Sequence, residues 1–546
     1  MEVKILNREI SVMPQELNKY YDNSVKPPVI TPEGKEYLRE RVTDIDGEVY
    51  FFHGKASPMV TAAAMARLSR SPLDLRELIL DEFAMTGDED ATSLIQRVVT
   101  AYGDDSVQQL VGQHFVVEGA SNLLTKKLEW GRFGAYLEQS TRYIFFDRKD
   151  REGKYKYFVP ENLDTETSLI YTSTLDQIFD TYSEMVRSLT DYMRRTRTKP
   201  DELDENGWKA TTRAQACDAI RPVLPVATKS TVGIFKSSQA TENMVIRLLS
   251  DKLIEAQKIG GLILREARKV MPAFYERTDQ VDRGSATSGY LYNNRENIRD
   301  LAINLTDKED VPNEPVELLD FTPKNELDIV PDILFSESEI STKGLQRVIE
   351  QLTPEKQNEI LKTYIGNRLN RRHRPGRAME FPHYKFEITA DYGTFRDLQR
   401  HRVVDGFEWQ RLTTNYGYDI PELVKEAGMT DSFIKCFELS EKLYEYLQSR
   451  NLIEESQYAT LLGHKMRYRF MINAREAFHL LELRTSPQGH PGYRKIALKM
   501  HELIAEKHPI IAEGMIFINK GEDPEFTRLA AELGTQHKLS RLDQTN

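Results

Sequence analysis

The sequence contains two related segments, and this internal repeat limits the possible folds more than any other feature. Residues 114–139, HFVVEGASNLLTKKLEWGRFGAYLEQ, correspond to residues 384–409, YKFEITADYGTFRDLQRHRVVDGFEW, at a constant offset of 270. Few residues are identical, so the correspondence rests on the shared order of apolar, polar and capping positions. A repeat of this kind indicates duplication of a whole folding unit. A chain of 546 residues is long enough for two such units.

Each copy shows the same local order of strand, helix cap and helix. In the second copy Tyr384, Phe386 and Ile388 alternate with charged residues, which predicts a half-buried strand. Asp391 then stands where a helix N-cap belongs, ahead of apolar residues at helical spacing. In the first copy an alternating apolar stretch leads to Ser121 at the corresponding place. Both copies are therefore predicted to turn from a strand directly into a capped helix.

A second shared block lies downstream in each copy. Residues 236–247, KSSQATENMVIR, correspond to residues 473–484, NAREAFHLLELR, at an offset of 237. The first copy therefore carries 33 additional residues between its blocks, which we place in the stretch 147–205. Single strands mixed with long helices favour α+β domains, each with a mixed or antiparallel sheet. The expected division is an N-terminal extension (1–45), a first domain (46–295), an acidic, proline-containing linker (296–325) and a second domain (326–546).

Composition excludes several classes of protein. The net charge of −11 argues against a nucleic-acid partner, which needs a broad basic surface. The two cysteines form no CxxC motif, so neither a disulfide framework nor a cysteine-based metal site is expected. No apolar run has membrane-span length and the first residues do not look like a secretory signal, which predicts a cytoplasmic protein without a membrane partner. Three clusters of arginines in the second half, at residues 367–377, 400–402 and 467–475, instead favour a small anionic ligand.

Two motifs are divided between the copies. The second copy carries Arg400-His401-Arg402, where the first reads Trp130-Gly131-Arg132. The first copy carries Glu138-Gln139-Ser140-Thr141-Arg142-Tyr143, where the second has Gln410 and Leu412 in place of the serine and arginine. Together they resemble the flavin-dependent thymidylate synthases, whose signature is RHR-x7-E-x-S-x-R-Y. The upstream family element GHxSxxEH survives only in part, around Gly103–Ser106 and Gly376–Phe381, and without its histidines.

The first-copy motif suits a nucleotide. In an extended loop Glu138, Ser140 and Arg142 would point to one side, offering an acceptor, a hydroxyl and a cationic fork. Arg221 also matches a family arginine that binds the nucleotide, whereas the second copy has Gln457 there. The resemblance implies substrate-binding roles for Glu138, Ser140, Arg142, Tyr143 and Arg221, and catalytic roles for Ser140 and Arg247.

The second-copy motifs suit a flavin. The RHR triplet offers two forks and an imidazole for a phosphate, and Arg475 and His479 share one face of a helix at i, i+4 spacing. The first copy has Glu242 in place of His479, and its carboxylate would repel phosphates. The resemblance implies that FAD is bound by Arg400, His401, Arg402, Glu408, Asn473, Arg475, His479 and Arg484.

The resemblance implies C5 methylation of dUMP, with methylenetetrahydrofolate giving the carbon and FAD passing reducing equivalents from NADPH. Family members are homotetramers with sites between subunits, so a homodimer of fused chains is expected to form a pseudo-tetramer. We expect one composite site, with the nucleotide motif from the first copy and the flavin motif from the second. The reciprocal site, with Leu412, Trp130 and Glu242, is expected to be inactive.

Two alternatives remain open at this point. One is a related enzyme that modifies C5 of another pyrimidine nucleotide or adds a hydroxymethyl group. The other is a catalytically silent nucleotide-binding or scaffold protein, favoured by the missing upstream histidines and by Trp130-Gly131. RNA binding through residues 367–377 is a more distant third reading, given the acidic balance of the chain.

Overall fold

The computed structural model describes residues 18–68, 70–97, 105–201, 203–306 and 314–522. Residues 1–17 of the predicted extension, residues 307–313 of the predicted linker, and Gly103 and Asp104 lie outside the described residues. None of the described helices is long and apolar enough to cross a membrane.

The two copies form two antiparallel sheets with the same strand order. The first sheet runs β3-β5-β4 and the second β6-β7-β9-β8, so that β5 and β9 are equivalent central strands. Gln113 pairs with Lys236 in the first sheet, and His383 pairs with Asn473 in the second. These pairs reproduce the offsets of 270 and 237 found in the sequence. The strands are β3 (Gly112–Ser121), β4 (Gly134–Glu138), β5 (Lys229–Ser237), β6 (Val316–Thr322), β7 (His383–Asp391), β8 (Asp405–Trp409) and β9 (Lys465–Asn473).

The predicted turn from strand into capped helix is present in both copies. Ser121 Oγ accepts a hydrogen bond from the Leu124 backbone N–H (3.0 Å) at the start of α5 (Asn122–Leu128). Asp391 accepts one from the Thr394 N–H (2.8 Å) at the start of α15 (Tyr392–Leu398). The side chains predicted to face inward from β7 are fully buried. The tandem α+β fold is therefore confirmed.

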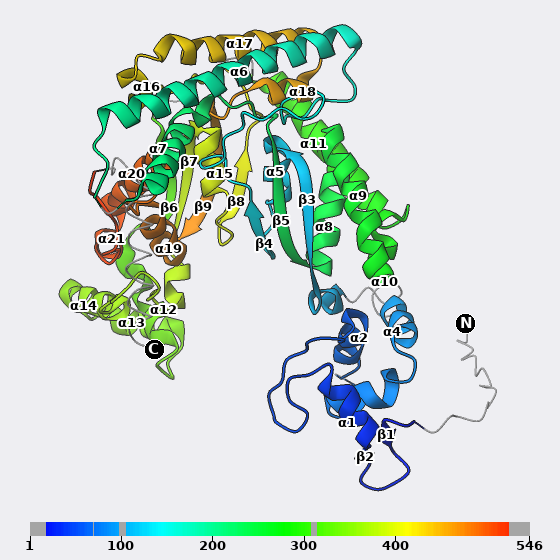
Figure 1. Ribbon diagram of the computed structural model, residues 1–546. Coiled ribbons are helices and arrows are strands. Elements are labelled where there is room, and N and C mark those ends of the chain that lie inside the picture. Colours follow the sequence, from blue (N-terminus) through cyan, green and yellow to red (C-terminus); the bar gives the residue numbers. More distant parts are fainter. Residues whose placement is uncertain (1–17, 69, 98–104, 202, 307–313, 523–546) are drawn as a thin grey trace.

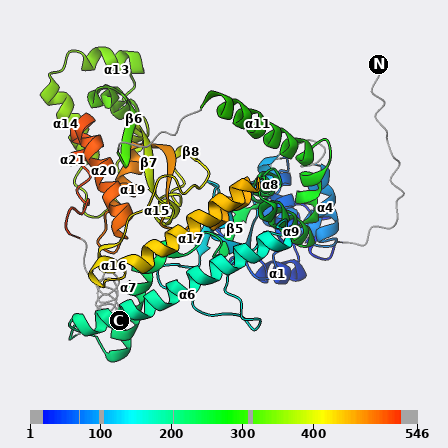
Figure 2. The ribbon, with the colours of Figure 1, turned by 90° about the horizontal axis from the view of Figure 1, so that it is seen from above.

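Helices cover the two sheets, which lie side by side (Figure 1). One group lies beside the first sheet and a second group beside the second sheet, while α6 and α17 pack together across one end of both (Figures 1 and 2). The helices of the first copy are α6 (Thr165–Thr196), α7 (Glu205–Ile220), α8 (Ser238–Leu249), α9 (Ile254–Val270), α10 (Pro272–Tyr275) and α11 (Gly284–Leu305). Those of the second are α12 (Val330–Phe335), α13 (Thr342–Ile349), α14 (Pro354–Ile365), α16 (Glu422–Glu426), α17 (Thr430–Ser449), α18 (Ile453–Ser456), α19 (Ala474–Arg484), α20 (Pro491–Lys507) and α21 (Pro509–Glu513).

The additional residues of the first copy lengthen two helices. Helix α6 has 32 residues against 20 in α17, and α7 has 16 against 4 in α18. The extra length thus extends past the predicted stretch 147–205 into α7. A small N-terminal unit precedes the first sheet, built from β1 (Tyr21–Asp22), β2 (Val29–Ile30), α1 (Pro32–Arg39), α2 (Pro58–Leu68), α3 (Leu75–Leu78) and α4 (Asp88–Ile95).

Much of the segment predicted as a linker is regular structure. The expected limit at residues 295 and 296 falls inside α11, and β6 forms the edge strand of the second sheet. Val316 is buried and pairs with Ile388. Acidic residues and prolines suggested a linker, but the alternating apolar residues of β6 complete the sheet face. The domain limits themselves stay a prediction.

The two copies pack into one continuous apolar core. Backbone hydrogen bonds also cross between them, from the Val226 N–H to the Thr460 carbonyl (2.8 Å) and from the Leu462 N–H to the Leu224 carbonyl (2.8 Å). The Tyr392 hydroxyl donates to the Asn122 carbonyl (2.9 Å). Because buried polar groups pair only in a fixed geometry, the copies hold each other's loops in place.

Candidate functional site

Arg142 of the first-copy motif is fixed by a carboxylate on α7. Its Nε and Nη2 atoms donate to the two oxygens of Asp218 at 3.0 and 2.9 Å, a bidentate pair. The Ser140 hydroxyl accepts from the Arg142 backbone N–H (3.2 Å). Burial of Asp218 favours its neutral form, but His490, Arg142 and Arg221 outweigh burial and lower its pKa to about 2. The guanidinium is therefore oriented before any ligand arrives.

Asp397, near the end of α15, contacts Arg484 and is stabilised in its ionised form by arginines of both copies. Arg484 Nη2 donates to the Asp397 carbonyl (2.5 Å), and Arg484 Nη1 lies 4.0 Å from the Asp397 carboxylate. Burial raises the pKa of Asp397, but Arg400, Arg484, Arg221 and Arg142 together bring it below its usual value. The predicted cofactor residue Arg484 is thus held at Asp397, and the charges of Arg142, Arg221 and Arg400 also favour the ionised form of this carboxylate.

His401 connects this cluster to α19. Its Nε2 atom accepts a hydrogen bond from Arg484 Nε (3.0 Å), since an arginine N–H can only donate. The proton of the neutral His401 ring therefore lies on Nδ1, which faces the Glu476 carboxylate at 3.1 Å. Burial, followed by Arg484 and other nearby cations, holds the pKa of His401 well below its usual value. Atoms of His401, Glu476 and His479 lie within 4.8 Å of one another. Both ring nitrogens of His401 are occupied and arginines surround the group, which makes it unsuitable for a metal cation.

A basic cavity of about 520 Å3 opens next to this group. It is lined by Arg475, His479 and three arginines of the segment 367–377, namely Arg371, Arg372 and Arg374. Within the described ranges, none of those three forms an ion pair. Burial and then Arg374, Arg371 and Arg484 lower the pKa of His479 to about 4, so its imidazole is neutral at pH 7. Convergent arginines without carboxylate partners fit a phosphate-bearing ligand.

A second cavity of about 500 Å3 shares Arg371 and Leu483 with the basic cavity. It includes Arg484 and Tyr493, whose ring centroid lies 5.2 Å from the Arg484 guanidinium carbon. The Tyr493 ring lies 6.3 Å from the ring of His490, whose Nε2 atom lies 4.0 Å from Asp218, the partner of Arg142. The candidate site therefore extends from Arg142 past Tyr493 and Arg484 to the basic cavity.

Glu138 does not face a ligand beside Ser140 and Arg142, which corrects the sequence prediction. Its carboxylate is buried and contacts Lys126 Nζ (2.8 Å), Arg396 Nη2 (2.8 Å) and Arg400 Nη2 (3.3 Å). The prediction assumed an extended loop through all three motif residues, but β4 ends at Glu138 and the chain turns at residues 141–143. Glu138 instead joins the two copies.

Several predicted cofactor residues have local partners. Glu408 pairs with Arg469 (2.8 Å) on the second sheet, and the Asn473 side chain caps α19 by accepting from the Glu476 N–H (2.8 Å). Arg402 lies over the ring of Tyr136, 5.3 Å from its centroid, on the side of the first copy. Tyr143 is partly exposed beside Arg142.

Arg247 lies in a different cavity from the other predicted first-copy residues. This reciprocal cavity, of about 420 Å3, is lined by Trp130, Arg247, Trp409, Gln410 and Gln457 among others, but by none of Glu138, Ser140, Arg142 and Arg221. Arg247 Nη2 donates to the Lys127 carbonyl (3.0 Å), which is the counterpart of the bond from Arg484 to Asp397. Arg247 therefore lies in a cavity apart from Arg142, whereas its counterpart Arg484 lies on the cavity that includes Tyr493.

Sequence reasoning missed Asp218, Asp397, Arg396 and Tyr493. Asp397 and Arg396 stand three and four positions before Arg400 of the RHR triplet, so their place in the sequence was a usable signal. Asp218 and Tyr493 lie far from either motif in the sequence, and only the fold brings them to the site.

Comparison with known proteins decides the family. The family described as "Thymidylate synthase complementing protein" matches residues 54–273 and 317–510, one region in each copy. The chain belongs to this family. It is 32% identical over 509 residues to a UPF0159 protein of Chlamydia muridarum, covering 90% of this chain and 96% of the relative.

Other similar proteins include a UPF0159 protein of Thermoplasma acidophilum, 28% identical over 497 residues, which cover 86% of this chain and 97% of the relative. A solved structure, the UMP/dUMP methylase PolB from Streptomyces cacaoi bound with 5-Br dUMP, is similar with a TM-score of 0.31 and 18% identity. That similarity covers 38% of this chain and 97% of the solved chain.

The pairing of Asp218 predicts a specific loss of stability in acid. The pKa of Asp218 in the folded chain, about 2, lies below the ordinary value of 3.8. Its contribution to the free energy of unfolding is therefore complete above about pH 4 and is lost as the pH falls towards 2. We expect the natural chain to lose about 2 kcal/mol more unfolding free energy over this interval than Asp218→Asn. Urea unfolding of both proteins at pH 4 and at pH 2 measures the difference, and parallel losses would contradict the assignment.

Proposed function

We propose that this chain is a flavin-dependent thymidylate synthase-like enzyme that converts dUMP to dTMP, with methylenetetrahydrofolate as carbon donor and NADPH as reductant. Its active site is composite, with dUMP held mainly by the first copy and FAD by the second. Family membership supports the reaction class. The observation that carries the composite site is the series of contacts from Arg142 through Asp218, His490 and Tyr493 to Arg484, which joins the two copies.

The residues of the basic cavity fit FAD. Arg371, Arg372 and Arg374 have no carboxylate partners in the described part of the chain, and Arg475 and His479 complete the lining. These side chains would hold the diphosphate through charge-assisted hydrogen bonds. When bound, the flavin supplies the transfer of reducing equivalents.

The chain's own residues bind and polarise the nucleotide. Arg142 uses Nε and Nη2 on Asp218, which leaves Nη1 for the phosphate of dUMP. Arg484 is held by the Asp397 carbonyl and by His401 Nε2, so its position is fixed before the substrate binds. A fixed cation of this kind stabilises negative charge that develops on the pyrimidine ring during proton loss at C5.

Release of tritium from dUMP labelled at C5 tests the proposed reaction. We expect release that requires FAD, NADPH and methylenetetrahydrofolate, with dTMP as the chromatographed product. A hydroxymethylated nucleotide would instead identify the related C5-modifying activity. Absence of release from protein that binds both FAD and dUMP would contradict the proposal.

The arginines of the basic cavity predict the strength of flavin binding. Because each charge-assisted hydrogen bond contributes about 1.5–3 kcal/mol, Arg374→Ala and Arg475→Ala are each expected to weaken FAD binding about tenfold or more. Visible absorption of the dialysed protein, titrated with FAD, gives the affinity. Arg469→Ala is the matched control, because Arg469 pairs with Glu408 at the surface. Equal affinities in all three variants would place the flavin elsewhere.

A further inference from the structure

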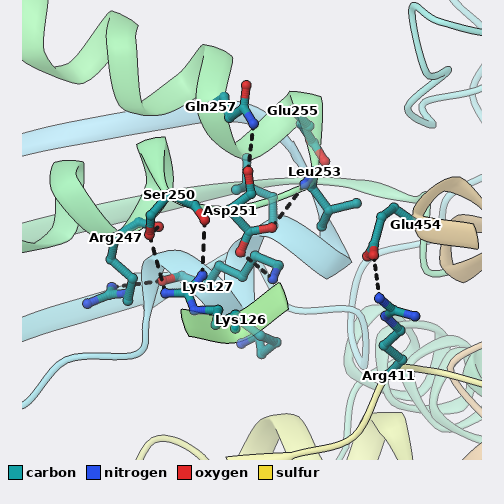
Figure 3. Close-up of polar contacts among 12 residues, drawn as sticks. Lys126, Lys127, Arg247, Ser250, Asp251, Leu253, Glu255, Gln257, Arg411 and Glu454 are labelled. Carbon is teal, nitrogen blue, oxygen red and sulfur yellow. Dashed lines mark hydrogen bonds and ion pairs between the residues drawn. The ribbon is translucent and has the colours of Figure 1, made fainter. Parts of the chain in front are cut away.

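The reciprocal cavity lies where the copies meet in the opposite combination. The first copy contributes Arg247 and Trp130, and the second contributes Trp409, Gln410 and Arg411. Figure 3 shows Arg247, Lys127 and Asp251 on one side and Arg411 paired with Glu454 (2.7 Å) across from them. At about 420 Å3 the cavity is within the range that holds a nucleotide-sized molecule.

Arg247 is incompletely paired in this cavity. In the second copy, Nε of its counterpart Arg484 donates to the ring of His401. The first copy has Gly131 in the position of that histidine, and Arg247 Nε is buried without a hydrogen-bond partner. A buried, unsatisfied donor costs free energy that a ligand acceptor can recover.

A second cation stands where the histidine is missing. Lys236 is buried, and a Cβ atom on Gly131 would lie only 2.8 Å from its Nζ atom. Burial, then Arg247 and Arg402, lower the pKa of Lys236 to about 8. Within the described residues, neither Lys236 nor Arg247 forms an ion pair with a carboxylate. Where the second copy has the acceptor His401, the first copy thus has the ammonium group of Lys236 without a carboxylate partner among the described residues.

The lining also combines excess positive charge with aromatic rings. Its six cationic side chains face four carboxylates. Among the described residues, Arg295 of α11 donates to the Ser250 carbonyl and hydroxyl alone, at 3.2 and 3.3 Å. The rings of Trp130 and Trp409 lie 5.2 Å apart edge to face, and Arg247 lies 5.1 Å from the Trp130 ring. Indole faces next to an incompletely paired cation suit a ligand with a flat ring and an anionic group.

We propose that the reciprocal cavity is a second binding site for a pyrimidine mononucleotide, in which the ligand is bound and not converted. Arg247 and Arg295 hold the anionic group, and Trp130 and Trp409 contact the ring. Conversion is not expected, because Gly131 and Glu242 stand where the flavin motif of the second copy has His401 and His479, and Leu412 stands where the first copy has Arg142. Leu412 is buried and offers no charge. This site is independent of the proposed reaction.

Tryptophan fluorescence tests the site directly, because the chain has three tryptophans and two of them line the cavity. In a Trp208→Phe background, titration with dUMP is expected to give saturable quenching. Adding Arg247→Met is expected to weaken dUMP about tenfold or more. Arg484→Ala, in the other site, is expected to leave the quenching unchanged.

Arg295→Gln, on the partly exposed helix α11, gives a second variant should Arg247→Met fail to fold by circular dichroism, and it too is expected to weaken quenching. Three results would overturn the proposal. The first is that dUMP causes no quenching. The second is quenching that disappears in Arg484→Ala but survives in both Arg247→Met and Arg295→Gln. The third is that inorganic phosphate binds with the same affinity as dUMP. If the protein releases no tritium but its tryptophan fluorescence is quenched by dUMP in the expected pattern, the proposed reaction is refuted and the second binding site stands.

Discussion

The Arg484→Ala variant is expected to release tritium from dUMP about 100- to 1000-fold more slowly than the natural chain, the loss typical of removing one fixed donor to developing negative charge. Arg484 is positioned by the Asp397 carbonyl and by His401, and it lies on the cavity that adjoins the basic cavity. Arg142→Ala, in the other copy, is expected to cause a loss of similar size because it removes a cation for the phosphate. Initial rates at saturating cofactors measure both effects.

Arg469→Ala serves as the control for loss of an arginine from the second sheet, because its side chain is half-exposed. Mixing Arg142→Ala and Arg484→Ala chains tests whether the site forms within one chain. Since Arg142 is connected to Arg484 through Asp218, His490 and Tyr493 of the same chain, the mixture is expected to stay inactive. Restored activity would mean that the site forms between chains. A loss in Arg247→Ala but none in Arg484→Ala would place the reaction in the reciprocal cavity.

Features set by local sequence were predictable. The strand alternation of β7 and the caps Ser121 and Asp391 depend on residues within a few positions of one another, and the structure confirms them. The repeat offset was also visible, because both copies keep the same order of elements. These features were enough to place the RHR triplet at a helix end, whereas the strand β4 that precedes Arg142 was not predicted.

The roles of equivalent residues in the two copies could not be predicted, because they depend on partners distant in sequence. Arg247 and Arg484 end equivalent helices and make the same backbone contact, yet only Arg484 meets a histidine. Glu138 and Glu408 end equivalent strands, but Glu138 is buried by the facing copy and Glu408 is exposed. Burial and pairing at the contact between copies decide each role, and a motif carries no information about either.

Glu138→Gln is expected to destabilise the chain by about 3–5 kcal/mol, the usual cost of removing one partner from a buried ion pair. Its carboxylate compensates Lys126 and Arg396, whose side chains are both nearly inaccessible to solvent. Burial works against ionisation of Glu138, but Arg396, Lys126 and Arg400 more than offset it and hold its pKa well below the usual value. Glutamine keeps the shape and leaves two buried cations with Glu129 as their one carboxylate partner within the described residues.

The equivalent residue of the second copy provides the control. Glu408 forms one exposed pair with Arg469, so Glu408→Gln is expected to change the unfolding free energy by no more than about 0.5 kcal/mol. Urea midpoints at pH 7 measure both variants. Because the folded pKa of Glu138 is depressed, its contribution is present above its unfolded pKa and is lost in acid, so the gap between natural chain and Glu138→Gln should narrow as the pH falls below about 4. Equal midpoints for the two variants at pH 7 would mean that the copies are not held together by this carboxylate, and that the arginines of the composite site are positioned by the apolar core alone.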